Sequence, residues 1–194
     1  MPGRIADPDL LPPGRRTGSL PPYGTLDDGL VAFAMRVAAG SVAERVSFHA
    51  GYRTAAADPG IDHLEVITEL RRLVLLAELR GARGWDDARE AREALEAYRG
   101  KLTVEARVRF HPQRGYTSLP RLELHLGSSI TMQPALDLRA EPVHGPAQDG
   151  PPVVVGAVIE ATFAAPAVRG VHTLVVHVDG VYLLVATIDL SRMP

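Results

Sequence analysis

Apolar and polar residues alternate with a period of two in the second half of the chain, which is the pattern of β-strands. Residues 102–110 and 121–126 both follow it, and a hairpin that keeps their apolar side chains on one face has a single register. That register predicts four opposed pairs: Phe110 with Leu122, Val108 with Leu124, Arg109 with Glu123, and Arg107 with His125.

The polar side of this predicted hairpin is the richest polar patch in the sequence. It consists of Arg107, Arg109, His111, Glu123 and His125. One interpretation is a solvated face joined by a cross-strand Arg109–Glu123 pair, worth well under ~1 kcal/mol. The other is a binding site for an anion or an acidic partner.

Further strands are expected at residues 135–140, 153–163, 172–178 and 181–190. Asp179 and Gly180 separate the last two, and an Asp-Gly pair between β-rich runs predicts a two-residue type I′ turn. This turn sets Val176 opposite Leu183, and Val175 opposite Leu184 on the other face. Because both faces are then apolar, one should meet a facing sheet and the other the helices or a partner.

The segment 169–190, which begins Arg-Gly-Val-His-Thr-Leu and contains the Val-Asp-Gly turn, resembles the closing hairpin of bacterial immunoglobulin-like sandwich domains. The resemblance covers about the last 40 residues and implies a sandwich fold without implying catalytic residues. The Cys and Trp framework of antibody domains is absent from the sequence.

The N-terminal half has helical periodicity instead. A first helix is expected from Thr25, its cap, to Gly40, with one apolar face. That face comprises Leu26, Leu30, Phe33, Ala34 and Val37. Residues 42–49 alternate well enough to favour a short strand, with a continued helix as the alternative.

A long helix is expected over 61–80, with Leu64, Ile67, Leu70, Leu73, Val74 and Ala77 as its buried stripe, widened by Leu75, Leu76 and Leu79. A third helix over 86–98 follows a short connection, which predicts an antiparallel helical hairpin. Residues 1–24 are rich in Pro and Gly and predict an extended arm. The arm is either a simple tail or a docking segment whose apolar anchors are Leu10, Leu11, Leu20 and Tyr23.

The fold expected is therefore α+β, with N-terminal helices packed on a C-terminal antiparallel β-sandwich-like module. Three segments are predicted: the arm over 1–24, a helical region over 25–100, and the β-module over 101–194. With only 5% aromatic residues, the core must be mainly aliphatic.

Composition excludes several classes of function. A net charge of −2 with interspersed signs gives no field to attract nucleic acid. No signal peptide or membrane-spanning stretch is visible, and the absence of cysteine excludes disulfides and thiolate sites. A cytoplasmic location fits these features. Lys101 is the only lysine among 21 basic residues, which indicates a GC-rich bacterial genome.

Signatures of catalysis are not found. The seven histidines lack chelating spacing, so neither a metal nor a cofactor is expected. Asp62, His63 and Glu65 fit the polar first turn of a helix better than an acid and base pair. We therefore expect a non-enzymatic interaction module or structural subunit of a bacterial assembly, with a protein partner or as a homo-oligomer. The alternative is a small hydrolase or ligand-binding protein with its site between helices and sheet.

Overall fold

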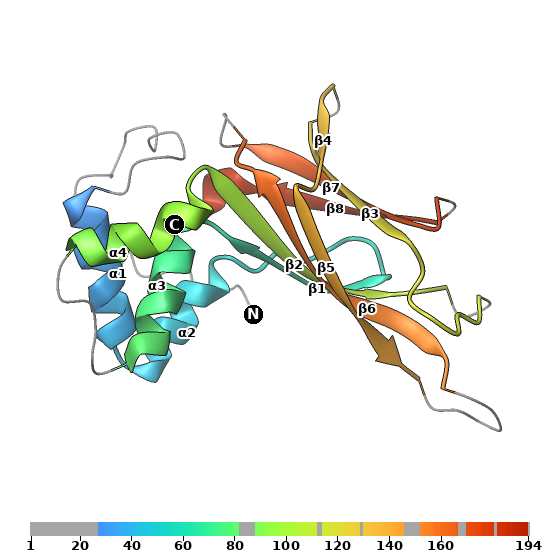
Figure 1. Cartoon of the computed structure of the whole chain (residues 1–194), viewed down its shortest axis with the longest axis horizontal. Helices are drawn as coiled ribbons and strands as arrows, with labels where there is room; N and C mark the ends of the chain where they lie inside the picture. Colours follow the sequence, from blue (N-terminus) through green and yellow to red (C-terminus); the bar gives the residue numbers. More distant parts are fainter. Residues whose placement is uncertain are drawn as a thin grey trace, which may run out of the picture. The chain divides into compact units, whose positions relative to one another are not determined.

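The computed structural model describes residues 27–81, 88–111, 114–128, 130–145, 152–166, 170–180 and 182–193. Its elements are four helices, two short 3-10 turns and eight strands (Figure 1). The helical elements are α1 (Asp28–Ala39), α2 (Val42–Ala50), α3 (Glu69–Arg80), α4 (Ala88–Leu95) and the 3-10 turns at Glu96–Tyr98 and Leu190–Arg192. The strands are β1 (Ile61–Ile67), β2 (Lys101–Arg109), β3 (Leu122–Gly127), β4 (Met132–Pro134), β5 (Asp137–His144), β6 (Val154–Ala164), β7 (Val171–Val178) and β8 (Tyr182–Asp189).

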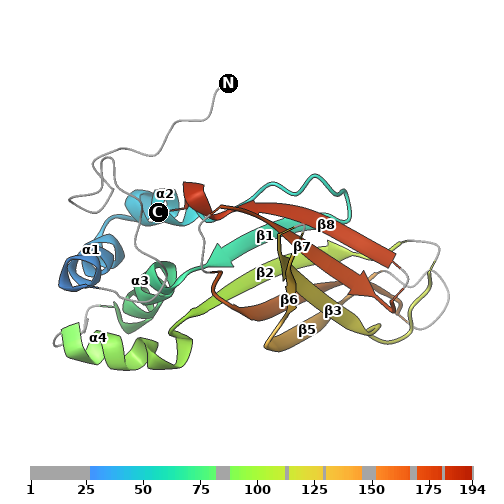
Figure 2. The same ribbon diagram turned by 90° about the horizontal axis from the view of Figure 1, so that it is seen from above.

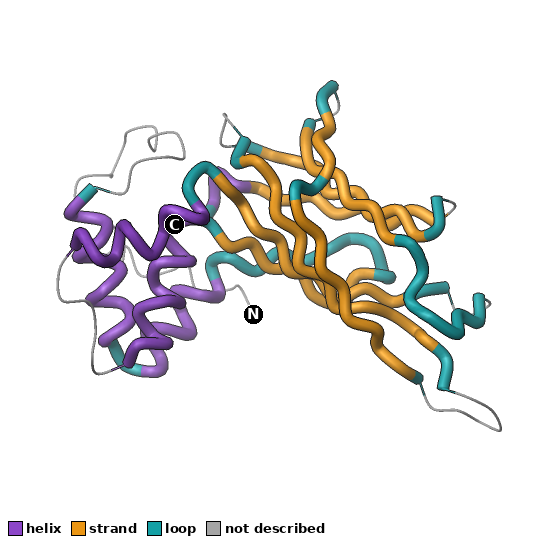
Figure 3. Tube along the Cα trace, viewed as in Figure 1, coloured by secondary structure: helices purple, strands orange, loops and turns teal. Residues whose placement is uncertain are grey.

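The chain forms two compact units, one helical and one built of strands (Figure 3). The helical unit holds α1 to α4, and the β-unit holds the segments 53–66 and 102–191. The α+β class with two antiparallel sheets is thus confirmed. No helix in the described ranges has both the length and the apolarity needed to cross a bilayer.

Side-chain caps fix the helix starts in the N-terminal region. The Asp27 carboxylate accepts a hydrogen bond from the backbone N–H of Leu30 at 2.8 Å, so Asp27 caps α1. The predicted cap, Thr25, and Leu26 lie outside the described residues. Gly40 ends α1 as predicted, and the other predicted apolar residues of its face are buried: Leu30, Phe33, Ala34 and Val37.

The strand predicted over 42–49 is wrong, because this segment is the helix α2. Ser41 and Glu44 form a capping box in which each side chain accepts from the other's backbone N–H. Phe48 is the buried residue of α2. Most of α2 is exposed, so its sequence has no broad apolar stripe and its few apolar residues give the appearance of alternation. The capping box is the local feature that marks this segment as a helix.

The single helix predicted over 61–80 is also wrong. Residues 61–67 form β1, and Thr68 then caps α3 by accepting from the N–H of Arg71 at 3.3 Å. Leu64 therefore packs in the β-unit instead of on a helix, while Leu70, Leu73, Val74 and Ala77 remain the buried stripe of α3. The widened stripe fails at Leu79, which is exposed.

Within the helical unit, α1 packs against α2, α3 and α4, and the unit also buries a charged residue. Arg71 lies 5.3 Å from the ring of Tyr52 and donates to Nδ1 of His49 at 3.4 Å. The other ring nitrogen of His49 contacts the Glu78 carboxylate at 3.1 Å. α4 follows α3 in the chain and packs against it, and the two helix axes cross steeply in Figures 1 and 2.

The β-unit contains two four-stranded sheets (Figure 2). The first sheet has the order β1-β2-β6-β5, and the second has the order β4-β3-β7-β8. Alternate side chains of both sheets are buried and make an aliphatic core with two phenylalanines, Phe110 and Phe163. Core residues of these strands include Leu102, Val104, Val108, Leu124, Leu126, Ile159, Leu174, Val176, Leu184 and Ile188. The predicted strands over 135–140 and 153–163 correspond to β5 and β6.

The hairpin predicted between residues 102–110 and 121–126 does not form, because β2 and β3 belong to different sheets. β2 lies between β1 and β6, and β3 pairs with β4 and β7. The four predicted cross-strand pairs are therefore absent. Both strands have the alternation that the sequence shows, but they direct their apolar sides into the core from opposite sheets.

The final hairpin forms with a register one residue different from the prediction. Val178 pairs with Tyr182, so three residues connect the strands, and Asp179 and Gly180 both have positive φ, at 51° and 67°. The backbone N–H of Arg121 donates to the Asp179 carboxylate at 2.8 Å, and the N–H of Asp179 donates to the Arg121 carbonyl at 2.8 Å. These long-range bonds favour the longer turn, in which Leu184 instead of Leu183 faces the core.

The edge strands of both sheets carry features that oppose the addition of another strand. Thr54 donates to the carbonyl of Leu64 on β1, and the Asp58 carboxylate accepts from the N–H of Val185 on β8 at 3.3 Å. Pro142 on β5 has no N–H to offer. β4 is only three residues long. The described edge strands therefore offer little open backbone for pairing with another strand.

Candidate functional site

The five residues predicted as one polar patch are distributed over two sheets. Arg107 and Arg109 lie on β2 in the first sheet and His111 follows it, whereas Glu123 and His125 lie on β3 in the second sheet. The patch does not exist as a single site. Its members instead take part in three separate surfaces of the β-unit.

Arg107 lies on the outer face of the first sheet, in a shallow depression of about 420 Å³ with Asp62, His63, Glu105, Ala106 and Val158. Beside it, the largely buried carboxylate of Glu65 contacts Nε2 of His63 at 3.0 Å and accepts from Nε of Arg53 at 2.7 Å. His63 and Glu65 are neighbours because side chains two apart on a strand share a face. The prediction of a polar helix turn for them is wrong, since they belong to β1.

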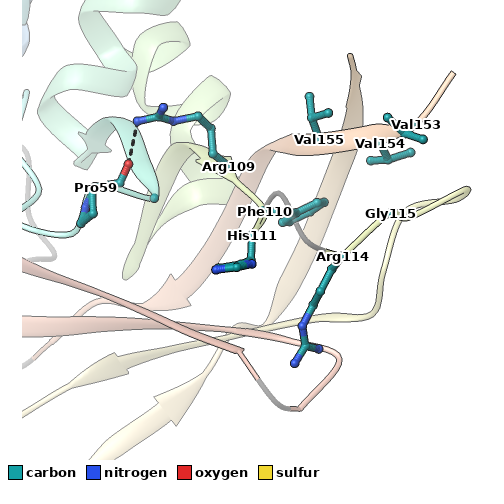
Figure 4. Close-up of a pocket in the computed structure, with 10 residues that line it drawn as sticks. Pro59, Arg109, Phe110, His111, Arg114, Gly115, Val153, Val154 and Val155 are labelled. Carbon is teal, nitrogen blue, oxygen red and sulfur yellow. Dashed lines mark hydrogen bonds between the residues drawn. The ribbon is translucent and has the colours of Figure 1, made fainter. Parts of the chain in front are cut away.

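Arg109 and His111 line a pocket of about 450 Å³ (Figure 4). The other lining residues are Pro59, Gly60, Phe110, Arg114, Gly115, Val153, Val154 and Val155. Nε of Arg109 contacts the Asp62 carboxylate at 2.8 Å, and an Nη of the same guanidinium donates to the Pro59 carbonyl at 2.7 Å. Asp62 thus replaces Glu123 as the ionic partner of Arg109.

The floor of this pocket is apolar and well packed. Phe110 is only 6% exposed, and its ring meets that of Tyr116 edge to face at 5.3 Å. The N–H of Phe110 donates to the carbonyl of Val155 at 2.8 Å, and Tyr116 forms a bridge with Val154. Backbone pairing therefore holds both sides of the pocket.

Glu123 and His125 lie on the outer face of the second sheet. The side chains of β3, β7 and β8 on this outer face are those of Glu123, His125, Val171, Thr173, Val175, His177, Leu183, Val185, Thr187 and Asp189. The rings of His125 and His177 meet edge to face at 5.4 Å, and Glu123 pairs with Arg121 at 2.7 Å. Leu183 and Val185 remain 48% and 38% exposed. The sequence left the helices or a partner as the cover of this hairpin face, and that alternative stays a prediction.

Sequence reasoning missed the residues that only the tertiary fold brings together from distant segments of the chain. No sequence motif marks Arg114. None marks Leu183 and Val185 either, although strand alternation with the correct register would have placed both on the outer face. Among the described residues, no group of three His, Asp or Glu side chains is arranged to hold a metal ion. The predicted arm anchors lie outside the described residues: Leu10, Leu11, Leu20 and Tyr23.

Comparisons with known proteins add no identification to this geometry. No family model, no curated protein and no solved structure matches the chain.

Proposed function

We propose that the protein is a non-enzymatic interaction module, a structural or accessory subunit of a bacterial assembly, that associates with a second copy of itself through the outer face of the second sheet. The observation that carries this proposal is the exposed apolar centre of that face, where Leu183 and Val185 are 48% and 38% exposed beside half-buried Val175. Contiguous apolar surface of this kind marks interaction sites.

The charge on the face suits contact between identical copies. A two-fold contact brings like residues together, so it requires a surface that lacks unpaired charge. Glu123 and Asp189 are the acidic residues of the outer face; Arg121 pairs with the carboxylate of Glu123, and the carboxylate of Asp189 accepts hydrogen bonds from the N–H and the hydroxyl of Ser191. The other residues of the face are His, Thr, Val and Leu. Two copies can therefore meet without repulsion between buried like charges.

The blocked sheet edges support a face-to-face contact. Pro142 on β5 and the Asp58 carboxylate over β8 both oppose pairing of backbone groups with another strand. Association that buries the face of a sheet depends on the side chains of that face, so a single substitution there can abolish it.

Light scattering coupled to size-exclusion chromatography tests the proposal. We expect the wild-type protein to dimerise as its concentration rises, and Leu183→Glu to be monomeric because symmetry would bury two carboxylates near each other. The matched control is Val158→Glu, since Val158 is 46% exposed on the outer face of the first sheet. Circular dichroism should show both variants folded.

Three results would count against the proposal. They are a wild-type monomer throughout the micromolar range, a Leu183→Glu protein that still dimerises, and loss of the dimer in the Val158→Glu control as well. If the wild type were a monomer that binds a different protein through this face, that protein would be the occupant in place of a second copy.

A further inference from the structure

The pocket beside Arg109 combines three features: an apolar floor, cationic side chains and a backbone fixed by pairing. We propose that this pocket binds a small monocarboxylate that carries an aryl or alkyl group. The site is distinct from the outer face of the second sheet, and the inference does not depend on self-association.

Charge selects the class of ligand. Arg109 and Arg114 bring two positive charges to the pocket, and the Asp62 carboxylate that contacts Arg109 offsets one of them. Within the described part of the chain, the guanidinium of Arg114 has no hydrogen-bond or ion-pair partner. Counted over these described residues, one positive charge is left for a ligand, which suits a monoanion better than a phosphate dianion. A planar carboxylate also matches the donor geometry of a guanidinium.

The apolar side selects the rest of the ligand. Phe110 and the valines Val153, Val154 and Val155 line the pocket, and its volume of about 450 Å³ falls in the usual range for small-molecule sites. Val155 is 39% exposed and Val153 is half-buried, so a fully polar acid would leave their side chains in contact with water. An aryl or alkyl group of a few carbons would cover it and gain from its burial.

The placement of these groups orients the ligand. In Figure 4, Phe110 lies between the valines at the start of β6, residues 153–155, on one side and the side chains of His111 and Arg114 on the other. The guanidinium of Arg109 turns to the Pro59 carbonyl, which holds it in place. A ligand that lies across the Phe110 ring therefore has its hydrocarbon on the valine side and its carboxylate near Arg114.

The pocket is built before any ligand arrives, which lowers the entropy cost of binding. The edge-to-face contact with Tyr116 fixes the ring of Phe110. The N–H of Arg109 donates to the carbonyl of Gly60 at 2.7 Å, and this bond fixes the opposite wall. Only the exposed side chain of Arg114 must become ordered.

Calorimetric titration of the full chain with 4-phenylbutanoate and with 4-phenylbutan-1-ol tests the inference. The two probes share their hydrocarbon and differ in charge. We expect saturable binding of the carboxylate, with the alcohol weaker by about tenfold, because one charge-assisted hydrogen bond is lost.

Two substitutions assign the effect to this pocket. Arg114→Gln should remove most of the tenfold preference and leave the affinity for the alcohol unchanged. Arg139→Gln is the matched control, because Arg139 is an exposed arginine on β5, with its Nε 3.6 Å from the carboxylate of Asp137 and remote in sequence from the pocket. It should behave as wild type. Chemical-shift changes on adding the carboxylate should centre on Phe110 and Val155.

Several results would overturn the inference. They are equal affinity for the carboxylate and the alcohol, an unchanged preference in Arg114→Gln, or shift changes remote from the pocket. Absence of saturable binding of either probe in the millimolar range would also refute it. Because the dimer test uses Leu183 and this test uses Arg114, the two proposals can fail separately.

Discussion

Replacing Leu184 with alanine tests the register of the β7–β8 hairpin, and Leu183 is its matched control. The two leucines are adjacent on the same strand and differ only in the face on which they lie. Leu184 is fully buried, whereas Leu183 is 48% exposed. A two-residue turn would have reversed these positions, with Leu183 facing the core beside Val176.

The magnitude follows from how closely Leu184 is packed. Its Cδ2 lies so near the backbone of Gly60 that a Cβ at that position would be only 2.4 Å away. Removing a side chain from so tight a site leaves a cavity, so Leu184→Ala should destabilise the β-unit by about 3 kcal/mol. Leu183→Ala removes a half-exposed side chain and should cost less than about 1 kcal/mol.

Urea denaturation followed by circular dichroism would measure both values under one set of conditions. We expect a clearly lower midpoint for Leu184→Ala with an unchanged m-value, and a midpoint near wild type for Leu183→Ala. Low protein concentration keeps self-association out of the comparison. Equal destabilisation by the two variants, or a larger effect at Leu183, would refute the register described for this hairpin.

Two further predictions concern local packing and local electrostatics. Gly156→Ala should prevent stable folding of the β-unit, because the new Cβ would lie 2.2 Å from the carbonyl oxygen of Val108. Gly170→Ala is the control and should fold normally, because open space surrounds that position. Thermal melts of the two variants would test this difference. The Ser41 side-chain and backbone hydrogen bonds hold the pKa of Glu44 below its ordinary value. A lowered folded-state pKa stabilises the fold above the unfolded-state pKa, and this contribution is lost as pH falls through the folded-state value. An NMR titration should show the pKa of Glu44 rising toward its ordinary value in Ser41→Ala, because the side-chain hydrogen bond is lost while the backbone one remains, and an unchanged pKa would contradict the capping role.

The candidate site could be predicted only in part. Alternation along 102–110 correctly placed Arg107 and Arg109 on the polar side of a strand, and it gave Glu123 and His125 the same position on another. It could not show that the two strands occupy different sheets. The pocket therefore acquired Arg114 and three valines that no local pattern connected with Arg109.

Some expectations stay predictions. The docking role of the arm falls on residues outside the described ranges, and the resemblance of the last hairpin to immunoglobulin-like domains is not tested by the two-sheet arrangement itself. The deletion of residues 1–24 would still separate a docking arm from a simple tail. A lower affinity of the truncated protein for itself would support the former.

The sequence by itself determined the properties that depend on neighbouring residues. Periodicity located β2, β3, β5 to β8 and most of α1, α3 and α4, because the spacing of apolar side chains must match the repeat of each element. Gly40 ended a helix and Asp179 with Gly180 made a turn for equally local reasons.

Tertiary structure decided everything that depends on distant partners. Residues 61–67 have enough apolar positions for a helix, but pairing beside β2 and with Arg53 makes them a strand. Sheet membership of β3 and the register of β8 were likewise set by contacts across the sandwich and by the Arg121–Asp179 bonds. The physical reason is that the local conformational energies of these alternatives differ little. Only one alternative buries a complete apolar face, and that burial is worth several kcal/mol.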